Sequence, residues 1–329
     1  MGGDLVLPAA PRRALITGVT GFAGGFLADL LLRQGWQILG TSPDGRWERF
    51  SAPELVSRVP LIPWDFSEGR AFEKVLPVVK EFRPHAIFHL AALSIPEKCG
   101  QLDPTPEAWR INVEGTGQIL ALAEQLNPIP HFLFVSSSHV YGAVEHSAPF
   151  VDETQPTTPH NAYGKTKLAA EELCRQAADR GVPVVIVRAF HHSGPRQQPP
   201  MLLPQWAKQF ADPASREVTV YTLDAVIDLS DVRDVVRAYY LLVEKEQRGI
   251  FNVGSGRAVS TRELYQLLVE VSGRNLPARE IRPGHRQEPI ARIERIQNAT
   301  GWSPQIPLRQ TVSDTLLWWQ EYLRSRTAG

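Results

Sequence analysis

The sequence has little of what marks secreted, membrane-spanning or nucleic-acid-binding proteins. It contains only two cysteines, Cys99 and Cys174, in 329 residues, and their spacing fits neither a metal site nor a disulfide framework. We therefore expect a cytoplasmic protein without a bound metal. The 35 basic and 35 acidic residues give a formal net charge of zero, which argues against nucleic acid or a membrane surface as a partner. No apolar run approaches the roughly 18 residues of a membrane span.

The order of the apolar segments predicts an α/β fold. Short runs rich in β-branched residues alternate with amphipathic helical runs as far as about Phe190, which predicts a doubly wound parallel sheet of the Rossmann type. The texture then changes to proline-rich loops with further strands and helices. We expect residues 1–188, with a return at 217–250, to form the dinucleotide-binding domain. Residues 189–216 and 251–329 are expected to form a smaller C-terminal α/β substrate lobe over the carboxyl edge of the sheet.

A glycine-rich turn follows the first expected strand, in ALITGVTGFAGGFLADLLL (residues 14–32). Gly18 permits a tight turn, Gly21 lets the backbone approach a pyrophosphate, and Gly24 lets the helix pack on the strand. The free N–H groups and positive potential of a helix start favour phosphate groups. A tight turn that binds nothing is the alternative. The segment predicts a dinucleotide site formed by Gly18, Gly21, Phe22, Ala23 and Gly24.

The end of the second expected strand bears on the choice between NAD(H) and NADP(H). NAD sites usually place an acidic residue there, about 20 residues beyond the glycines, to hold the ribose hydroxyls. This chain has Thr41 and Ser42 instead, with Arg46 nearby, which favours the 2′-phosphate of NADP(H). Asp44 follows closely and keeps NAD(H) open. Asp65, after the third strand, is a candidate acceptor for the adenine amine or, alternatively, a turn residue.

Tyr163 and Lys167 stand four residues apart in NAYGKTKLAAEEL (residues 161–173), a strongly helical segment. Four residues make about one helical turn, so the two side chains share a face. An ammonium group beside a phenol favours the phenolate and lowers the pKa of the phenol. The pair is therefore a candidate proton donor or acceptor, although an ordinary solvated helix face can show the same spacing.

Five ordered motifs resemble the extended short-chain dehydrogenase/reductase family: TGVTGFAGG, FHLAAL, NVEGT, VSSSHVYG and YGKTK. The later segments RAFHHSGPRQ, DLSDVRDVVRAYY, FNVGSG and TGWSPQIPL resemble its nucleotide-sugar branch. Within that branch the similarity is greatest to the GDP-mannose 4,6-dehydratases and the GDP-4-keto-6-deoxy-mannose reductases. The resemblance covers nearly the whole chain.

This resemblance implies an active site. Tyr163 would exchange a proton with the 4-oxygen of a sugar, and Lys167 would hold the nicotinamide ribose and lower the pKa of Tyr163. Ser137, which lies between two further serines, would hydrogen-bond the same oxygen, while a hydride moves between C4 and the nicotinamide. The expected cofactor contacts also include Thr41, Ser42, Asp65, Phe66, Leu90, Ala91, Ala92, Tyr163, Lys167 and His192. The expected substrate contacts are Ser94, Ser138, His139, His191 and Arg282.

Departures from the family's pattern bear on the reaction and the substrate. The 4,6-dehydratases carry a carboxylate directly after the catalytic serine or threonine, whereas this chain has Ser138 and His139. Elimination thus lacks its usual base, and reduction is favoured. Ile227 replaces an arginine that often reaches the substrate diphosphate, and His191 replaces a substrate-contacting asparagine. Arg282 matches another family arginine that contacts the diphosphate.

We therefore expect NADP(H)-dependent reduction of a 4-keto nucleotide sugar. The alternatives are an NAD-dependent C4 epimerase, a 4,6-dehydratase, and a non-enzymatic cofactor-binding scaffold or sensor. Arg196 and Arg286 are candidates to compensate for Ile227. The family also implies that Asn112 holds the central helix against the sheet, and that helices within 112–126 and 167–176 pair in a homodimer.

Overall fold

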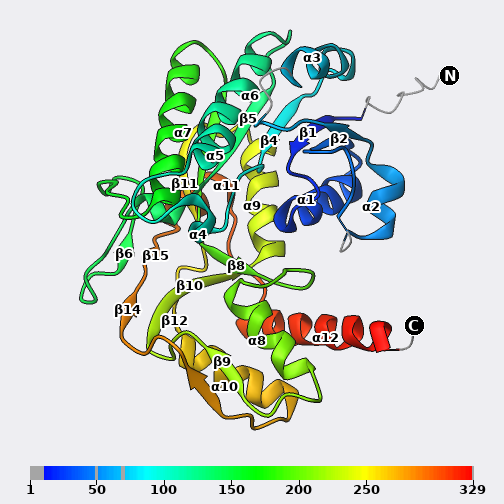
Figure 1. The fold of residues 1–329 in the computed structure, drawn as a ribbon. Coiled ribbons are helices and arrows are strands. Elements are labelled where there is room, and N and C mark those ends of the chain that lie inside the picture. The colour runs from blue at the N-terminus through cyan, green and yellow to red at the C-terminus, as the bar shows by residue number, and fades with distance from the viewer. Residues whose placement is uncertain (1–10, 49–50, 68–70, 328–329) are drawn as a thin grey trace, which may run out of the picture.

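The computed structural model describes residues 11–48, 51–67 and 71–327. A parallel β-sheet with helices on both faces forms its larger part, and a smaller lobe lies beyond the carboxyl edge of that sheet (Figure 1). In the described residues the main sheet has seven strands, in the order β11 (Gly249–Val253), β7 (Val184–Ala189), β5 (His131–Ser137), β4 (Ala86–His89), β1 (Arg13–Thr17), β2 (Gln37–Ser42) and β3 (Leu61–Pro63). The strands that follow β1 in sequence are added on both of its sides, first β2 and β3 and then β4, β5, β7 and β11. The strand order therefore reverses between β1 and β4, and such sheets bind ligands at this switch point.

Strand β1 shows why the sheet is covered on both faces. Ala14 and Ile16 belong to one apolar cluster, whereas Leu15 belongs to another. Successive side chains of a strand point to opposite faces, so an uninterrupted apolar strand needs a cover on each side. The predicted doubly wound sheet is confirmed. One face carries α1 (Phe22–Arg33) and α9 (Val232–Glu244), and the other carries α3 (Ala71–Phe82), α6 (Gly115–Glu124) and α7 (Ala162–Asp179).

The smaller lobe encloses an apolar cluster of its own, in which Trp206, Phe210 and Trp319 are buried. Its helices are α8 (Leu202–Ala211), α10 (Thr261–Ser272) and α12 (Leu308–Thr327). Its strand pairs are β10 (Ala225–Asp231) with β8 (His191–Ser193), β12 (Ala258–Ser260) and β14 (Arg286–Gln287), β9 (Val218–Val220) with β13 (Ala278–Glu280), and β15 (Ile290–Ala291) with β6 (Phe150–Val151). The shorter helices are α2 (Pro53–Arg58), α4 (Pro96–Cys99), α5 (Pro106–Trp109), η1 (Arg110–Glu114), η2 (Ser138–Val140) and α11 (Glu294–Thr300).

The chain passes between the two parts at places that differ from the expected boundaries. Segment 217–250 was expected to return to the dinucleotide-binding domain, but β9 and β10 pair in the smaller sheets. Helix α9 packs against the main sheet, and β11 extends that sheet past position 250. The apolar pattern of a strand shows that it is buried without showing which sheet it joins, so these boundaries required the tertiary structure.

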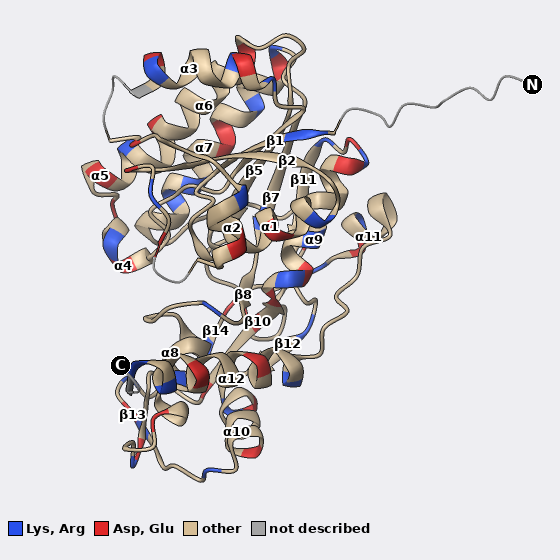
Figure 2. Cartoon of the chain, turned by 90° about the vertical axis from the view of Figure 1, so that its right-hand side faces the viewer, with Lys and Arg blue, Asp and Glu red and all other residues tan. Residues whose placement is uncertain are grey.

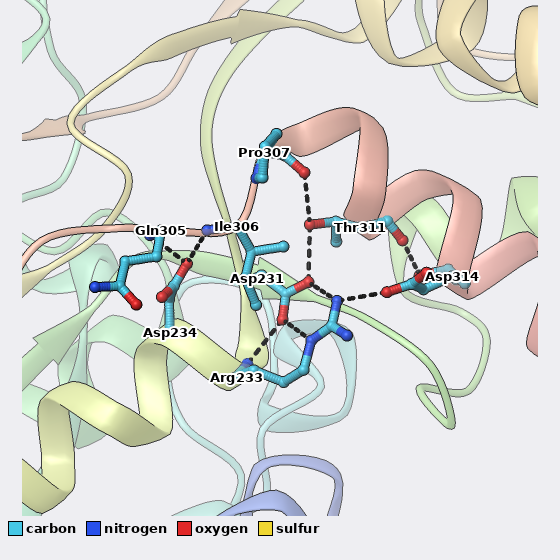
Figure 3. Close-up of polar contacts among 9 residues, drawn as sticks. Asp231, Arg233, Asp234, Gln305, Ile306, Pro307, Thr311 and Asp314 are labelled. Atoms are coloured by element: carbon cyan, nitrogen blue, oxygen red, sulfur yellow. Dashed lines mark hydrogen bonds and ion pairs between the residues drawn. The ribbon is translucent and has the colours of Figure 1, made fainter.

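A polar cluster joins α9 to α12 (Figure 3). Asp231 caps α9 by accepting a hydrogen bond from the Arg233 backbone at 2.8 Å, and it also pairs with the Arg233 guanidinium at 2.7 Å. Thr311 of α12 donates to the same carboxylate at 2.8 Å. Arg233 in turn reaches Asp314 of α12 at 2.8 Å. Asp231, at the end of β10, thereby links α12 of the smaller lobe to the start of α9, which packs on the main sheet.

Charges of both signs are interspersed over the side of the molecule shown in Figure 2. The view shows blue and red residues on most helices, with neither sign confined to one lobe. In the part of the chain that the structure describes, no helix is both long and apolar enough to cross a membrane.

Candidate active site

A cavity of about 740 Å³ lies at the carboxyl ends of the main-sheet strands. Its wall contains every residue expected for catalysis or cofactor binding, and all the residues expected for substrate binding except Arg282. These wall residues are Gly18, Gly21, Phe22, Ala23, Gly24, Thr41, Ser42, Asp65, Phe66, Leu90, Ala91, Ala92, Ser94, Ser137, Ser138, His139, Tyr163, Lys167, His191 and His192.

The glycine turn has the geometry of a phosphate cradle. Gly18 adopts a φ of +69°, which strains any residue with a side chain, and its carbonyl accepts the Gly21 amide at 3.0 Å. A Cβ on Gly24 would lie 2.2 Å from the Gly18 oxygen. Helix α1 begins immediately after Gly21 with no side-chain cap, so its first N–H groups remain available to an anion. The residues present fit a dinucleotide pyrophosphate.

The turn after β2 differs in part from the expectation. Thr41 and Ser42 are buried in the cavity wall, and the Ser42 hydroxyl donates to the Arg46 carbonyl at 3.1 Å. Arg46, expected near a 2′-phosphate, does not contribute to the wall. Its amide donates to Asp44 at 3.0 Å, which folds the turn back on itself. The charged residue that lines this part of the cavity wall is instead acidic: Glu48.

Asp65 closes a turn and lies in the cavity wall. One carboxylate oxygen accepts hydrogen bonds from the backbone and hydroxyl of Ser67, at 2.8 and 2.7 Å. This is the geometry of a side chain that closes a turn. Asp65 also lines the cavity, between Trp64 and Phe66, and its role as acceptor for the adenine amine stays a prediction.

Asn112 ties three elements together beneath the site. Its side-chain oxygen accepts the Leu93 amide at 2.7 Å, and its amide nitrogen donates to the Leu93 carbonyl at 3.1 Å and to the Thr166 hydroxyl at 3.0 Å. These bonds join η1 to the loop after β4 and to α7. The expectation that Asn112 holds the central helix in place is confirmed.

Ser137 and Tyr163 meet because a strand end and a helix start face each other. Ser137 ends β5, and Tyr163 lies in the first turn of α7. That turn is fixed by Asn161, the N-cap residue, which accepts the Gly164 amide at 2.8 Å. Ser137 and Tyr163 are 6% and 9% exposed, and both line the cavity.

Lys167 lies one turn further along α7 and is 2% exposed. Its ammonium group donates to the Val135 carbonyl at 2.8 Å and lies 4.9 Å from the centre of the Phe134 ring. Burial lowers the pKa of Lys167 to about 8, because a charged group is disfavoured away from water. The ammonium lies 6.0 Å from the centre of the Tyr163 ring.

The pKa of Tyr163 shifts in the opposite direction to the one expected. We expected the neighbouring lysine to lower it, but burial raises the pKa of Tyr163, and nearby Cys99 acts in the same direction. Ser137 lowers it by less. Burial, which disfavours the charged phenolate, therefore sets the direction of the shift, and the phenol is neutral at physiological pH.

Histidines occupy the part of the cavity beside Tyr163. The His139 ring lies 5.5 Å from the Tyr163 ring and 6.0 Å from the His191 ring, measured between ring centres. Asn161 donates to Nδ1 of His139 at 2.9 Å. Burial, followed by the effect of His191, lowers the pKa of His139 to about 4. His139 is thus neutral near pH 7 and can act as a hydrogen-bonding group.

Glu288 was missed by the sequence reasoning because it lies far along the chain, after β14. It is 8% exposed and forms an ion pair with Arg286, which is therefore engaged with this carboxylate. Burial acts to raise the pKa of Glu288, but His191 and Arg286 hold it below its usual value. The carboxylate does not contribute to the cavity wall.

Two residues discussed for the substrate diphosphate lie outside the cavity. Arg282 is exposed on the lobe, with its guanidinium 5.4 Å from the Tyr221 ring centre. Ile227 is buried in the apolar cluster of the lobe. Arg196 does contribute to the wall, stacked 3.8 Å from the centre of the Phe26 ring of α1. Arg196 is therefore placed on the side of the glycine turn.

Further wall residues come from segments whose sequence did not indicate a place in the cavity. The proline- and glutamine-rich sequence of residues 195–200, before α8, indicated a loop. It did not indicate that this loop faces the cavity. Tyr239 lies within the helical segment VRDVVRAYYLLVEKE, where its apolar spacing indicated only a core position. The missed residues include Trp47, Glu48, Ser51, Leu55, Trp64, Ile111, Gln197, Gln198, Pro199, Pro200, Met201 and Tyr239.

Comparison with known proteins agrees with this geometry. The family model described as NAD dependent epimerase/dehydratase family matches residues 14–254. GDP-6-deoxy-D-mannose reductase from Pseudomonas aeruginosa is 29% identical over 325 residues, which cover 95% of this chain and 99% of the relative. UDP-glucose 4-epimerase from Azospirillum brasilense is 28% identical over 338 residues, which cover 96% and 94%.

A solved structure of RMD from Pseudomonas aeruginosa complexed with NADPH has a TM-score of 0.79 to this chain at 27% identity, covering 95% of this chain and 98% of that one. The similarity thus extends over both parts of the fold. The family and the enzyme class inferred from the motifs are confirmed. The chain is an enzyme of the short-chain dehydrogenase/reductase type and belongs to the NAD dependent epimerase/dehydratase family.

Proposed function

We propose that this protein reduces the 4-keto group of a nucleotide sugar with NADPH. One observation carries the proposal: Ser137, Tyr163 and Lys167 share a cavity with an uncapped glycine turn, and their end of the cavity wall has no carboxylate in the described residues. The described acidic wall residues are Glu48 and Asp65. They follow β2 and β3, on the far side of β1 and β4 from β5, which ends in Ser137.

The chain's own groups suit carbonyl reduction. A bound nicotinamide would supply the hydride. Tyr163, a neutral phenol whose pKa burial raises further, would donate a proton to the 4-oxygen as negative charge develops there. Ser137 would hydrogen-bond the same oxygen and fix its position. Lys167 would donate to the ribose hydroxyls, because its buried ammonium group lies one helical turn from Tyr163.

The surroundings of Tyr163 support reduction over the two alternative reactions. A 4,6-dehydratase needs a base to remove the C5 proton, and the neighbouring positions hold Ser138 and neutral His139. A C4 epimerase must also run the oxidative direction, in which the tyrosine accepts a proton as phenolate. Burial that raises the pKa of Tyr163 disfavours the phenolate and favours the donor role.

The substrate class and the cofactor rest on different observations. The Pseudomonas relative is named a GDP-6-deoxy-D-mannose reductase and matches almost the full length of this chain. NADP(H) is supported by Thr41 and Ser42 at the end of β2, where NAD sites usually have a carboxylate. It is also supported by the likeness to the NADPH-bound solved structure. Glu48 in the cavity wall acts against a 2′-phosphate.

Absorbance spectroscopy on the purified protein tests the proposal directly. A reductase should be isolated without reduced or oxidised nicotinamide and should consume added NADPH only when a 4-keto-6-deoxy nucleotide sugar is present. GDP- and UDP-linked 4-keto sugars should be compared in the same assay. Retained cofactor together with interconversion of 4-epimers would identify an epimerase. Binding without turnover of any substrate would support the scaffold alternative.

We also propose a homodimer formed through α6 and α7. These helices lie side by side on one face of the sheet (Figure 1). Leu173 on α7 is only partly buried in the single chain, and pairing with a second copy would cover it. Analytical ultracentrifugation should give twice the chain mass of 36.7 kDa, and Leu173→Glu should shift the protein toward monomer.

A further inference from the structure

Tyr239 on α9 is an unexplained polar group in the wall of the cavity. Its side chain is 0% exposed, and its hydroxyl has no hydrogen-bond partner among the described residues. By contrast, the buried hydroxyl of Tyr141 donates to Asn252 at 2.7 Å. An unpaired buried hydroxyl costs roughly 1–3 kcal/mol of stability, and phenylalanine would avoid that cost. A ligand would explain why a hydroxyl is present there.

The position of Tyr239 identifies the part of the ligand it faces. Helix α9 packs against α1, β5 and β7. Burial and, after it, Tyr163 raise the pKa of Tyr239, so its hydroxyl is neutral. Because β5 ends in Ser137, the packing of α9 on β5 and β7 places Tyr239 in the wall at the catalytic end of the cavity. Asp65 and Glu48 lie at the opposite end, beyond β1.

We propose that the Tyr239 hydroxyl binds the carboxamide of the nicotinamide ring and so sets the orientation of the ring. This inference rests on the proposed function, because it requires a bound nicotinamide cofactor. The carboxamide is the one neutral polar substituent of the ring, and a hydroxyl can either donate to its oxygen or accept from its nitrogen. The surrounding side chains of this face are apolar. A single hydrogen bond from Tyr239 therefore selects one rotation of the ring.

Isothermal titration calorimetry with Tyr239→Phe tests this role. The dissociation constant for NADPH should rise about 2- to 12-fold, which corresponds to the roughly 0.5–1.5 kcal/mol of one net hydrogen bond. The constant for 2′-phospho-ADP-ribose, which lacks the nicotinamide, should stay within about 1.5-fold. If the protein binds NADH more tightly than NADPH, the same comparison is made between NADH and ADP-ribose. Tyr240→Phe, on the same helix but outside the cavity wall, should change none of these constants.

The melting temperature of the cofactor-free protein gives a second readout. Tyr239→Phe should leave it unchanged or raise it, because the variant removes an unpaired buried hydroxyl. A fall of several degrees would identify a structural role and overturn the inference. So would equal weakening of NADPH and 2′-phospho-ADP-ribose, or no weakening of either. Failure of the unaltered protein to bind any nicotinamide dinucleotide would instead overturn the proposed function, and the inference with it.

Discussion

Tyr163 carries the proposed proton transfer, and its surroundings set the direction in which it works. The phenol is buried, shares the cavity wall with Ser137 and lies one helical turn from Lys167. Tyr163→Phe removes the proton donor while keeping the ring and its packing. We predict that kcat falls about 10²- to 10⁴-fold, the usual range for loss of a general acid, while the dissociation constant for NADPH changes less than about twofold. Stopped-flow measurement of NADPH oxidation tests the first value and calorimetry the second.

Tyr141→Phe is the matched control for that experiment. Tyr141 is also buried, but its hydroxyl bonds to Asn252 and does not line the cavity. This variant should lose about 1 kcal/mol of stability and keep its turnover. Unchanged turnover in Tyr163→Phe on every 4-keto sugar tested would show that another group donates the proton.

Glu48 tests the cofactor preference at the residue scale. Its carboxylate lies in the cavity wall just after β2, where a 2′-phosphate would be bound. We predict that Glu48→Gln tightens NADPH binding about 2- to 5-fold by removing like-charge repulsion of the size found between exposed groups, and leaves NADH binding equal or weaker. Glu54→Gln, on α2 outside the wall, serves as the control. An equal shift for the two cofactors would mean that Glu48 does not face the 2′-position.

At the scale of elements, local sequence was sufficient for the units that carry the site. The segment from β1 to α1 is specified by an apolar strand, glycines with positive φ or no room for a Cβ, and an amphipathic helix. Helix α7 is specified by its Asn161 cap and by a helical run in which Tyr163 and Lys167 share one face. These features act over one to three turns of chain, so they can be read without knowledge of distant neighbours.

The junction between α9 and α12 depends on Asp231 (Figure 3). Its side chain is fully buried and bonds to Arg233 and Thr311. We predict that Asp231→Asn lowers the free energy of unfolding by about 1–3 kcal/mol, since the amide cannot satisfy both the guanidinium and the N-terminal amide of α9. Urea denaturation measures the change. Asp314→Asn alters the half-buried partner of the same arginine and should cost less than about 1 kcal/mol; equal costs would contradict a special role for Asp231.

At the scale of the whole molecule, buried histidines make the fold sensitive to acid. Burial, followed by the charge of Lys167, lowers the pKa of His89 to about 3. The ring is 1% exposed and bonds to Thr17 at 2.6 Å and Thr116 at 3.0 Å. Burial also lowers the pKa of His139 to about 4. Both groups therefore bind fewer protons in the folded than in the unfolded chain between their folded values and about pH 6.5.

The sign of the effect follows from that difference. The unfolded chain binds more protons in this window, so the free energy of unfolding should fall as the pH decreases from about 6.5 toward 4. His89 alone contributes about 1.4 kcal/mol per pH unit. Burial raises the pKa of Asp228, so at this group the folded chain binds more protons than the unfolded chain. Asp228 by itself therefore raises the free energy of unfolding as the pH decreases. Urea denaturation at several pH values measures the slope, and His89→Asn should flatten it; a slope that is unchanged in this variant would exclude His89 as a cause.

The sequence by itself determined the Rossmann sheet and the glycine turn, because these are encoded in periodicity and in spacings within single elements. Its motifs also identified the family by resemblance and gave Ser137, Tyr163 and Lys167 as the candidate catalytic residues. Only the tertiary structure decided the direction in which the pKa of Tyr163 shifts, the place of Arg282 outside the cavity, the entry of Glu48 and Tyr239 into its wall, and the sheet that β10 joins. Each of these depends on groups far apart in the chain. Desolvation depends on what is packed around a group, and strand pairing on which partner it meets, and neither is written in a local pattern.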